Sequence, residues 1–335
     1  MSLNPQILID MLKLELKPLG QWLEDPDVTE IFVNPGGRVF VERLGEKHDE
    51  GVFLKEHEIL VALTTLSKMV GRDALANTEG ALISTSVEDL RISGAIAPVS
   101  PDGSFMTIRK HRDRSSRPSL ESLITEKKAL SQTQADRIVD LVINQKKNCV
   151  FAGGTGSGKT TLINAVLSRL PKHERILLIE DAMEINVELD DCIRLLTNAQ
   201  MGLTARKYAQ AAMRFSPARV ILGETRGDDT FDLFRLLNSG HAGSMTSVHA
   251  NSAMLALNVL EILYQQSLPE GANFNPDTVR RTIGAVVDVV VFLTKKTVEE
   301  DGVLRVRRGV EEILLINGIN RDGNYDFQDI TYEAS

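Results

Sequence analysis

A glycine-rich stretch in the middle of the chain has the residue types that bind the phosphates of a nucleotide. It fits the pattern G-x-x-x-x-G-K-[ST], with Gly153, Gly158, Lys159 and Thr160 at the defining positions. Glycines let backbone N–H groups approach phosphate oxygens closely, and a helix that begins near Gly158 points the positive end of its dipole at the same place. We therefore expect this loop to hold a nucleoside triphosphate.

Two side chains of this loop suit the phosphates and their metal ion. Lys159 can reach the β- and γ-phosphates, and the hydroxyl of Thr160 suits Mg²⁺. A glycine-rich turn with a chance lysine is the alternative, but an apolar run at 149–152 precedes the loop and apolar residues at helical spacing follow it. The residues expected to contact the nucleotide are Gly153, Gly154, Thr155, Gly156, Ser157, Gly158, Lys159, Thr160 and Thr161.

Acidic residues follow two other apolar runs, as hydrolysis of a triphosphate requires. The run 176–179 leads into Glu180 and Asp181, with Glu184 one turn later, and the run 220–222 leads through a glycine to Glu224. We expect Glu224 to activate or position the attacking water. Glu180 and Asp181 would act through Mg²⁺ or on the ribose side. Helix capping by Asp181 and solvation of Glu184 are the alternatives.

Two of the six histidines, His241 and His249, lie in a segment rich in glycine, serine and threonine at 240–251. Neither has the cysteine partners or the H-E-x-x-H spacing of a zinc site. We expect both to hydrogen-bond a phosphate or Glu224, with a purely structural role as the alternative.

The elements around these residues predict two domains. Residues 1–112 read as a small α+β domain, 113–120 as a polar, basic linker, and 121–335 as an α/β domain with a mostly parallel sheet and helices on both faces. In such a sheet the ligand lies at the carboxyl ends of the strands. The expected elements of the first domain are a helix in the first twenty residues, a hairpin of 30–33 with 38–42, a helix at 56–71, and strands at 88–98 and 104–109.

Further patterns define the second domain and its ends. Ser131 and Gln134 form a capping-box pattern that starts a helix. The tail after residue 287 is rich in strand patterns, and residues 320–324 read as a hairpin turn rather than a calcium loop. The amphipathic first helix either packs on its own domain or lies on a membrane surface.

Composition limits the class of protein. The chain has 335 residues, is 42% hydrophobic, and has a formal net charge of −8, which disfavours a dedicated nucleic-acid binder. No apolar run approaches the roughly 18 residues of a membrane span. The start lacks a secretory signal pattern and two cysteines make no disulfide framework, so we expect a cytoplasmic protein.

Taken together, the motifs resemble those of the secretion traffic ATPases of the type II and type IV systems. This resemblance spans roughly residues 20–295. Within the family the chain is most similar to the conjugal-transfer branch, the TrbB-type ATPases. One departure is Ala218, where the family commonly has aspartate after Pro217. The segments that match are 153–160 (Walker A), 180–184 (Asp box), 214–226 (Walker B), 240–251 (His box), 25–31 and 107–110.

This resemblance implies a RecA-like core and a homohexameric ring that hydrolyses ATP with Mg²⁺. It implies that the nucleotide lies between the two domains, with Arg91 and Arg109 matching the arginines that reach its phosphates and Arg112 and Arg114 as alternatives. His241 and His249 would sense the γ-phosphate. The implied partners are inner-membrane components of a conjugation or secretion apparatus, at the cytoplasmic face of the membrane.

Three other functions stay open at this level. A motor for pilus retraction or type II secretion shares the nucleotide site, and so does a DNA translocase or helicase on the same core. A scaffold that uses nucleotide only for assembly is the third. DNA-stimulated turnover with steep salt dependence would indicate the translocase.

Overall fold

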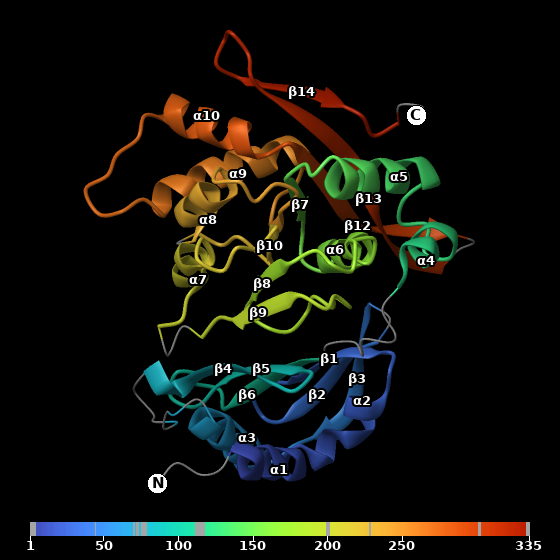
Figure 1. Cartoon of the computed structure of the whole chain (residues 1–335). Helices are drawn as coiled ribbons and strands as arrows, with labels where there is room; N and C mark the ends of the chain where they lie inside the picture. Colours follow the sequence, from blue (N-terminus) through green and yellow to red (C-terminus); the bar gives the residue numbers. More distant parts are fainter. Residues whose placement is uncertain are drawn as a thin grey trace. The chain divides into compact units, whose positions relative to one another are not determined.

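The computed structural model describes residues 5–43, 45–69, 71, 74, 79–110, 118–198, 202–227, 229–300 and 303–332. The chain divides into two compact units, Met1–Ser116 and Arg117–Ser335 (Figure 1). Most of the expected linker lies outside the described residues, and so do Arg112 and Arg114. No helix in the described ranges is long and apolar enough to cross a membrane.

Unit 1 is a six-stranded antiparallel sheet with strand order β3-β2-β1-β6-β5-β4. The predicted hairpin of 30–33 with 38–42, the strands near 88–98 and 104–109, and the helix near residue 56 are confirmed. The strands are β1 (Val28–Val33), β2 (Arg38–Arg43), β3 (Glu46–Phe53), β4 (Leu82–Val87), β5 (Leu90–Ala95) and β6 (Phe105–Lys110). The helices are α1 (Pro5–Glu15), η1 (Lys17–Leu19), α2 (Gly20–Glu24), α3 (Glu56–Met69) and η2 (Glu79–Ala81).

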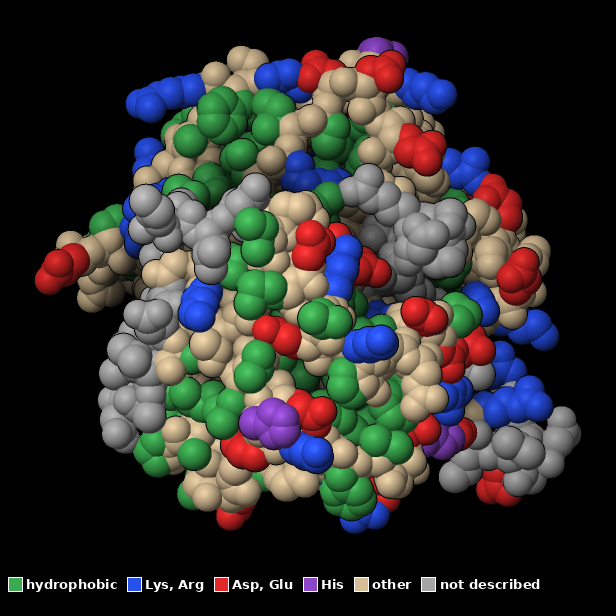
Figure 2. Space-filling view, turned by 90° about the horizontal axis from the view of Figure 1, so that it is seen from below, with side chains coloured by type: hydrophobic (Ala, Val, Ile, Leu, Met, Phe, Trp, Pro, Cys, Tyr) green, Lys and Arg blue, Asp and Glu red, His purple; other side chains and the backbone are tan. Residues whose placement is uncertain are grey.

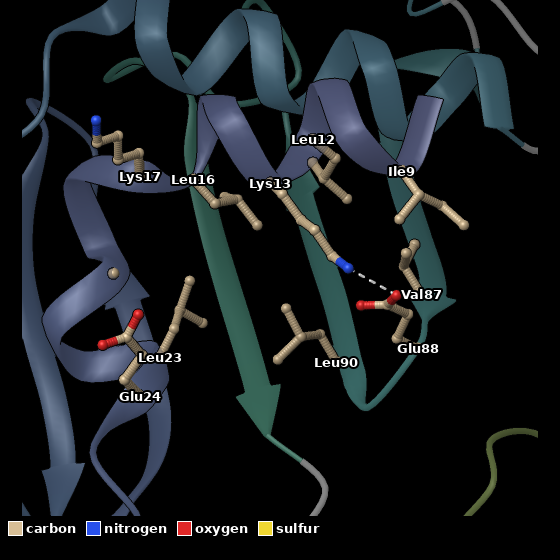
Figure 3. Close-up of a pocket in the computed structure, with 11 residues that line it drawn as sticks. Ile9, Leu12, Lys13, Leu16, Lys17, Leu23, Glu24, Val87, Glu88 and Leu90 are labelled. Carbon is tan, nitrogen blue, oxygen red and sulfur yellow. Dashed lines mark hydrogen bonds and ion pairs between the residues drawn. The ribbon is translucent and has the colours of Figure 1, made fainter. Parts of the chain in front are cut away.

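Helix α1 packs on its own unit through one apolar stripe. Leu8, Leu12 and Leu16 are buried, and α1 lies against α3. A hollow of about 320 Å³ lies between α1 and the β4–β5 hairpin, and the Lys13–Glu88 ion pair of 2.8 Å crosses it (Figure 3). Apolar side chains of α1 remain exposed. Figure 2 shows a face of the molecule on which hydrophobic and charged side chains are interspersed. The exposed apolar residues of α1 are Ile7, Met11 and Leu14.

Unit 2 contains an eight-stranded sheet with strand order β14-β13-β12-β7-β11-β10-β8-β9. The pairs from β12 to β9 are parallel, whereas β13 and β14 are added antiparallel. The strands are β7 (Cys149–Gly153), β8 (Ile176–Glu180), β9 (Cys192–Leu196), β10 (Arg219–Leu222), β11 (Met245–Val248), β12 (Val289–Glu300), β13 (Val303–Ile319) and β14 (Tyr325–Asp329).

Helices cover both faces of this sheet because its strands are apolar on both sides. In β7, Phe151 packs with the cluster of α5 and α6, whereas Val150 and Ala152 pack with the cluster of α9 and α10. This alternation is the period of two of a strand buried on both faces. The helical segments are α4 (Leu120–Thr125), α5 (Gln132–Val139), a π-helix η4 (Asp140–Asn144), α6 (Lys159–Leu167), α7 (Ala205–Ala212), α8 (Thr230–Leu237), α9 (Ala253–Gln266) and α10 (Pro276–Val286).

Several local predictions for unit 2 can be compared with the structure. The capping box of Ser131 and Gln134 is present, and residues 320–324 turn β13 into β14. The expected strands at 303–306 and 311–316 are one continuous strand, β13. Helix α10 and strand β9 were not predicted. Together these strands bring the glycine-rich loop and both acidic segments to the carboxyl edge of the sheet.

Candidate nucleotide site

The glycine-rich loop, which we call the P-loop (residues 153–160), joins β7 to α6. Two of its glycines are required by geometry. A Cβ atom on Gly153 would lie 2.3 Å from the carbonyl oxygen of Leu293 and 2.6 Å from the hydroxyl of Ser157. Gly158 caps α6 with a φ of 102°, which residues with a side chain rarely adopt. The loop therefore has the close backbone approach that phosphate binding needs.

Lys159 lies over this loop rather than in solvent. Its ammonium group donates hydrogen bonds to the carbonyl oxygens of Gly153 at 2.7 Å and Gly154 at 3.1 Å, and the residue is 8% exposed. The Ser157 hydroxyl oxygen is buried and has no hydrogen-bond partner within the described part of the chain. A cation and an unsatisfied buried hydroxyl at one loop fit a phosphate ligand.

Glu180, the last residue of β8, holds the loop that follows it. Its Oε1 accepts hydrogen bonds from the backbone N–H of Glu184 at 3.0 Å and of Ile185 at 2.6 Å. Burial raises the pKa of Glu180 from 4.5 to about 7, although these hydrogen bonds and Arg194, 3.6 Å from its Oε2, oppose the rise. Oε1 of Glu180 thus supports the loop that follows β8, whereas its Oε2 is buried without a hydrogen-bond partner in the described part of the chain.

Glu184 is the acid that reaches the P-loop. Its Oε2 accepts a hydrogen bond from the Thr160 hydroxyl at 3.2 Å, and its backbone carbonyl accepts one from Asn164 at 3.1 Å. Asn164 in turn accepts a hydrogen bond from the backbone N–H of Asn186 at 2.6 Å. The sequence analysis left solvation of Glu184 open as an alternative. It did not single out Asn164, whose position five residues after Lys159 on α6 was the available signal.

Glu224 lies beside the second histidine of the His-box segment. Its Oε1 is 2.9 Å from Nε2 of His249, and its Oε2 accepts two hydrogen bonds from Arg226, at 2.9 Å and 2.6 Å. Arg226 also pairs with Asp181, whose other oxygen accepts a hydrogen bond from Thr197 at 2.6 Å. Contacts therefore link the segments that follow β8, β10 and β11.

The register of the strands explains this meeting. β10 and β11 pair in parallel, so the residues that follow them emerge at the same edge of the sheet. The Ser247 hydroxyl donates to the Gly223 carbonyl at 2.7 Å, and the Thr225 N–H donates to the Ser247 carbonyl at 2.8 Å. Glu224 is held between these two anchored residues and beside His249.

His241 lies at the opposite edge of the sheet, which corrects the prediction that it senses the γ-phosphate. It precedes β11, whereas His249 follows it, and a strand of four residues spans roughly 13 Å. Nδ1 of His241 is 2.9 Å from the carbonyl oxygen of Leu236, and the His241 carbonyl accepts a hydrogen bond from Ser244 at 2.6 Å. These contacts give His241 a structural role in unit 2.

The two arginines expected to reach phosphates belong to unit 1. Arg91 on β5 and Arg109 on β6 are directly opposite each other in the strand register. Arg109 is exposed, and its Nε lies 3.7 Å from Oε1 of Glu30 on the neighbouring strand β1. They form a polar row on the sheet face opposite Ile92 and Ile108, which lie in the core.

Comparison with known proteins gives a consistent picture. The family described as type II/IV secretion system protein matches residues 15–296. The conjugal transfer protein TrbB of Rhizobium radiobacter is 30% identical over 308 residues, covering 90% of this chain and 88% of TrbB. The type IV secretion system protein VirB11 of Brucella abortus biovar 1 (strain 9-941) is 30% identical over 309 residues, covering 84% of this chain and 85% of VirB11. The solved ATPase DotB of Legionella pneumophila shares the fold, with a TM-score of 0.59 at 16% identity over 94% of this chain and 82% of DotB.

Proposed function

The chain belongs to the type II/IV secretion system protein family and is a secretion ATPase similar to TrbB and VirB11, and from this premise we propose that it works as a Mg²⁺-dependent, homohexameric motor of a conjugative type IV secretion system. The similarity to a conjugal transfer protein supports the conjugative role. The order of β7, β11, β10 and β8 supports a RecA-like arrangement of unit 2.

One observation carries the assignment of the site: an unbroken set of contacts runs from the P-loop to the expected catalytic acid. Thr160 contacts Glu184, and the same post-β8 loop presents Asp181 to Arg226. Arg226 and His249 then hold Glu224. The P-loop, the acid that contacts its threonine and the expected catalytic acid are therefore connected along one edge of unit 2.

Glu224 can still orient a water molecule in this arrangement. An ionised carboxylate has about four lone-pair positions, of which Arg226 uses two and His249 one. The remaining position on Oε1 can accept a proton from water. Arg226 fixes the direction of the carboxylate, so that Glu224 positions water and acts as a weak base.

The same residues fit Mg²⁺ and phosphate. Thr160 and Glu184 supply two oxygen atoms, and Mg²⁺ at nucleotide sites is commonly bound through one or two protein ligands together with phosphates and water. When bound, this ion neutralises charge that develops on the phosphates. Lys159 and the P-loop N–H groups hold those phosphates, and His249 is placed to sense the terminal one through Glu224.

Unit 1 completes the proposed motor. We assign to Arg91 and Arg109 the closure of unit 1 over the phosphates; loss of phosphate then removes contacts that favour the closed state and lets the units separate. We place the protein at the cytoplasmic face of the inner membrane as a peripheral component that contacts the apparatus there. The exposed apolar residues of α1 suit such contact.

The test measures ATPase rate against protein concentration, with light scattering on the same samples. A rate per subunit that rises as a ring of about six forms, and is lost in Glu224→Gln and Lys159→Ala, supports the proposal. A concentration-independent rate from a monomer contradicts the ring. Stimulation by DNA that falls steeply with salt would instead identify a translocase.

A further inference from the structure

The antiparallel pair β12–β13 continues well beyond the rest of the sheet. β7 pairs with β12 only from Val289 to Leu293, and β14 pairs with β13 only from residue 314 onward. Between these limits the two strands pair with each other as far as Glu300 and Val303. We call residues 294–300 and 303–309 the ribbon. Its base lies beside the P-loop because β12 is the immediate neighbour of β7.

Two consecutive cross-strand pairs at the base of the ribbon join like charges. Lys295 lies directly opposite Arg308, and Lys296 lies opposite Arg307. Like charges in this position destabilise a strand pair. At the Lys296–Arg307 pair, Glu311 offsets the positive charge, because its carboxylate is 2.6 Å from Nζ of Lys296. Local patterns that oppose stability are expected where they serve function.

The Lys295–Arg308 pair lies against the P-loop. Nε of Arg308 donates a hydrogen bond to the carbonyl oxygen of Gly156 at 2.8 Å. Nζ of Lys295 lies 3.8 Å from the position that a Cβ atom on Gly156 would occupy. Leu293, two residues before Lys295 and paired with Gly153 in the sheet, lies against the positions that Cβ atoms on Gly153 and Gly158 would occupy. The base of the ribbon is thus a wall of the P-loop.

Fixing the Gly156 carbonyl also fixes the direction of the next backbone N–H, that of Ser157. In a trans peptide the carbonyl oxygen and the following N–H point in opposite directions, so a carbonyl held on the ribbon side directs the Ser157 N–H away from it. There this N–H donates to the Gly154 carbonyl at 3.3 Å, inside the loop. Gly156 has a φ of 69° and no side chain to restrain it, so Arg308 supplies a restraint from outside.

From this geometry we propose that Arg308 is a positioning residue that holds the tip of the P-loop in its nucleotide-binding shape, and that Lys295 adds positive charge beside that tip. The inference rests on the proposed nucleotide site. Its consequence is slow release of product, because the loop tip must reorganise before a bound diphosphate leaves. The ribbon would then connect events at its far end to the rate of nucleotide exchange.

The test uses the full chain and the fluorescent analogue mant-ADP. We expect Arg308→Gln to release mant-ADP about tenfold faster and to raise KM for ATP about tenfold, with kcat unchanged or higher, since a hydrogen bond from a charged donor is lost. Arg307→Gln, on the opposite face of the same strand, is the matched control and should behave like the wild type. Arg308→Lys should lie between, because it keeps the charge without the Nε donor.

Four outcomes decide the inference. Equal release rates in the wild type and Arg308→Gln overturn it while leaving the ATPase assignment intact. A fall in kcat at constant KM overturns it too, as do equal effects of Arg307→Gln and Arg308→Gln. If Arg308→Gln does not fold, release of mant-ADP from Arg308→Lys at the wild-type rate overturns the inference. Failure of the proposed function is distinct: the wild type would then bind no mant-ADP, or Lys159→Ala would bind it equally well.

Discussion

Replacing Glu180 by glutamine should remove a specific pH dependence from the stability of unit 2. The side chain is buried, and its pKa rises from 4.5 to about 7 chiefly because burial penalises the charged form. Glutamine is nearly isosteric, and its carbonyl oxygen can still accept the hydrogen bonds from Glu184 and Ile185. The substitution therefore isolates the ionisation.

The sign and size follow from proton linkage. Between pH 4.5 and about 7 the folded chain keeps a proton on Glu180 that the unfolded chain has lost, so the contribution of Glu180 to stability falls as pH rises through this window. The shift of about 2.5 pH units corresponds to about 3 kcal/mol. For a unit of this size that is roughly 6–12 °C in Tm.

Differential scanning calorimetry of the wild type and Glu180→Gln at pH 5 and pH 8 measures this. We expect the wild type to lose stability relative to the variant between the two values. A Tm difference that is the same at pH 5 and pH 8 would show that Glu180 ionises normally, and the account of its burial would be refuted.

Four further substitutions separate the roles of residues in unit 2. His249→Ala should lower kcat about tenfold or more at unchanged Tm, whereas His241→Ala should lower Tm by a few degrees without changing KM for ATP; kinetics and calorimetry on both variants check this. Glu184→Gln should raise the Mg²⁺ concentration needed for half-maximal ATPase about tenfold, because Thr160 loses its charged neighbour, and an unchanged Mg²⁺ titration would contradict that role. Gly153→Ala should abolish mant-ADP binding, because its Cβ would overlap a backbone carbonyl at 2.3 Å; binding at wild-type affinity would show that the P-loop can be rebuilt.

The residues at the carboxyl edge of the unit 2 sheet were predictable where the sequence signal is local. The apolar runs before the P-loop, before Glu180 and before Glu224 are strands because each is short and buried on both faces. The run 245–248 was expected to be a strand, and it is β11. The prediction for His241 failed because the residues before and after a strand lie at its two opposite ends, and this consequence was not applied to His241 and His249. Strand β3 was missed because most of its residues are polar or exposed, and its pairing with β2 is through backbone atoms.

Contacts of side chains that are distant in sequence were beyond prediction, and they explain how the site divides its charge. In the sheet, β12 lies on one side of β7 and β11, β10 and β8 on the other. Glu184 therefore contacts the Thr160 hydroxyl of the P-loop from one side, and Arg226 links Asp181 and Glu224 along the same edge. Lys295 and Arg308 lie at the tip of the P-loop on the other side. A nucleotide with Mg²⁺ combines a cation with anionic phosphates. The acidic residues on one side of β7 complement the cation, and the basic residues on the other side complement the phosphates. The single strand β7 thus accounts for both the position of the P-loop and the separation of opposite charges around it.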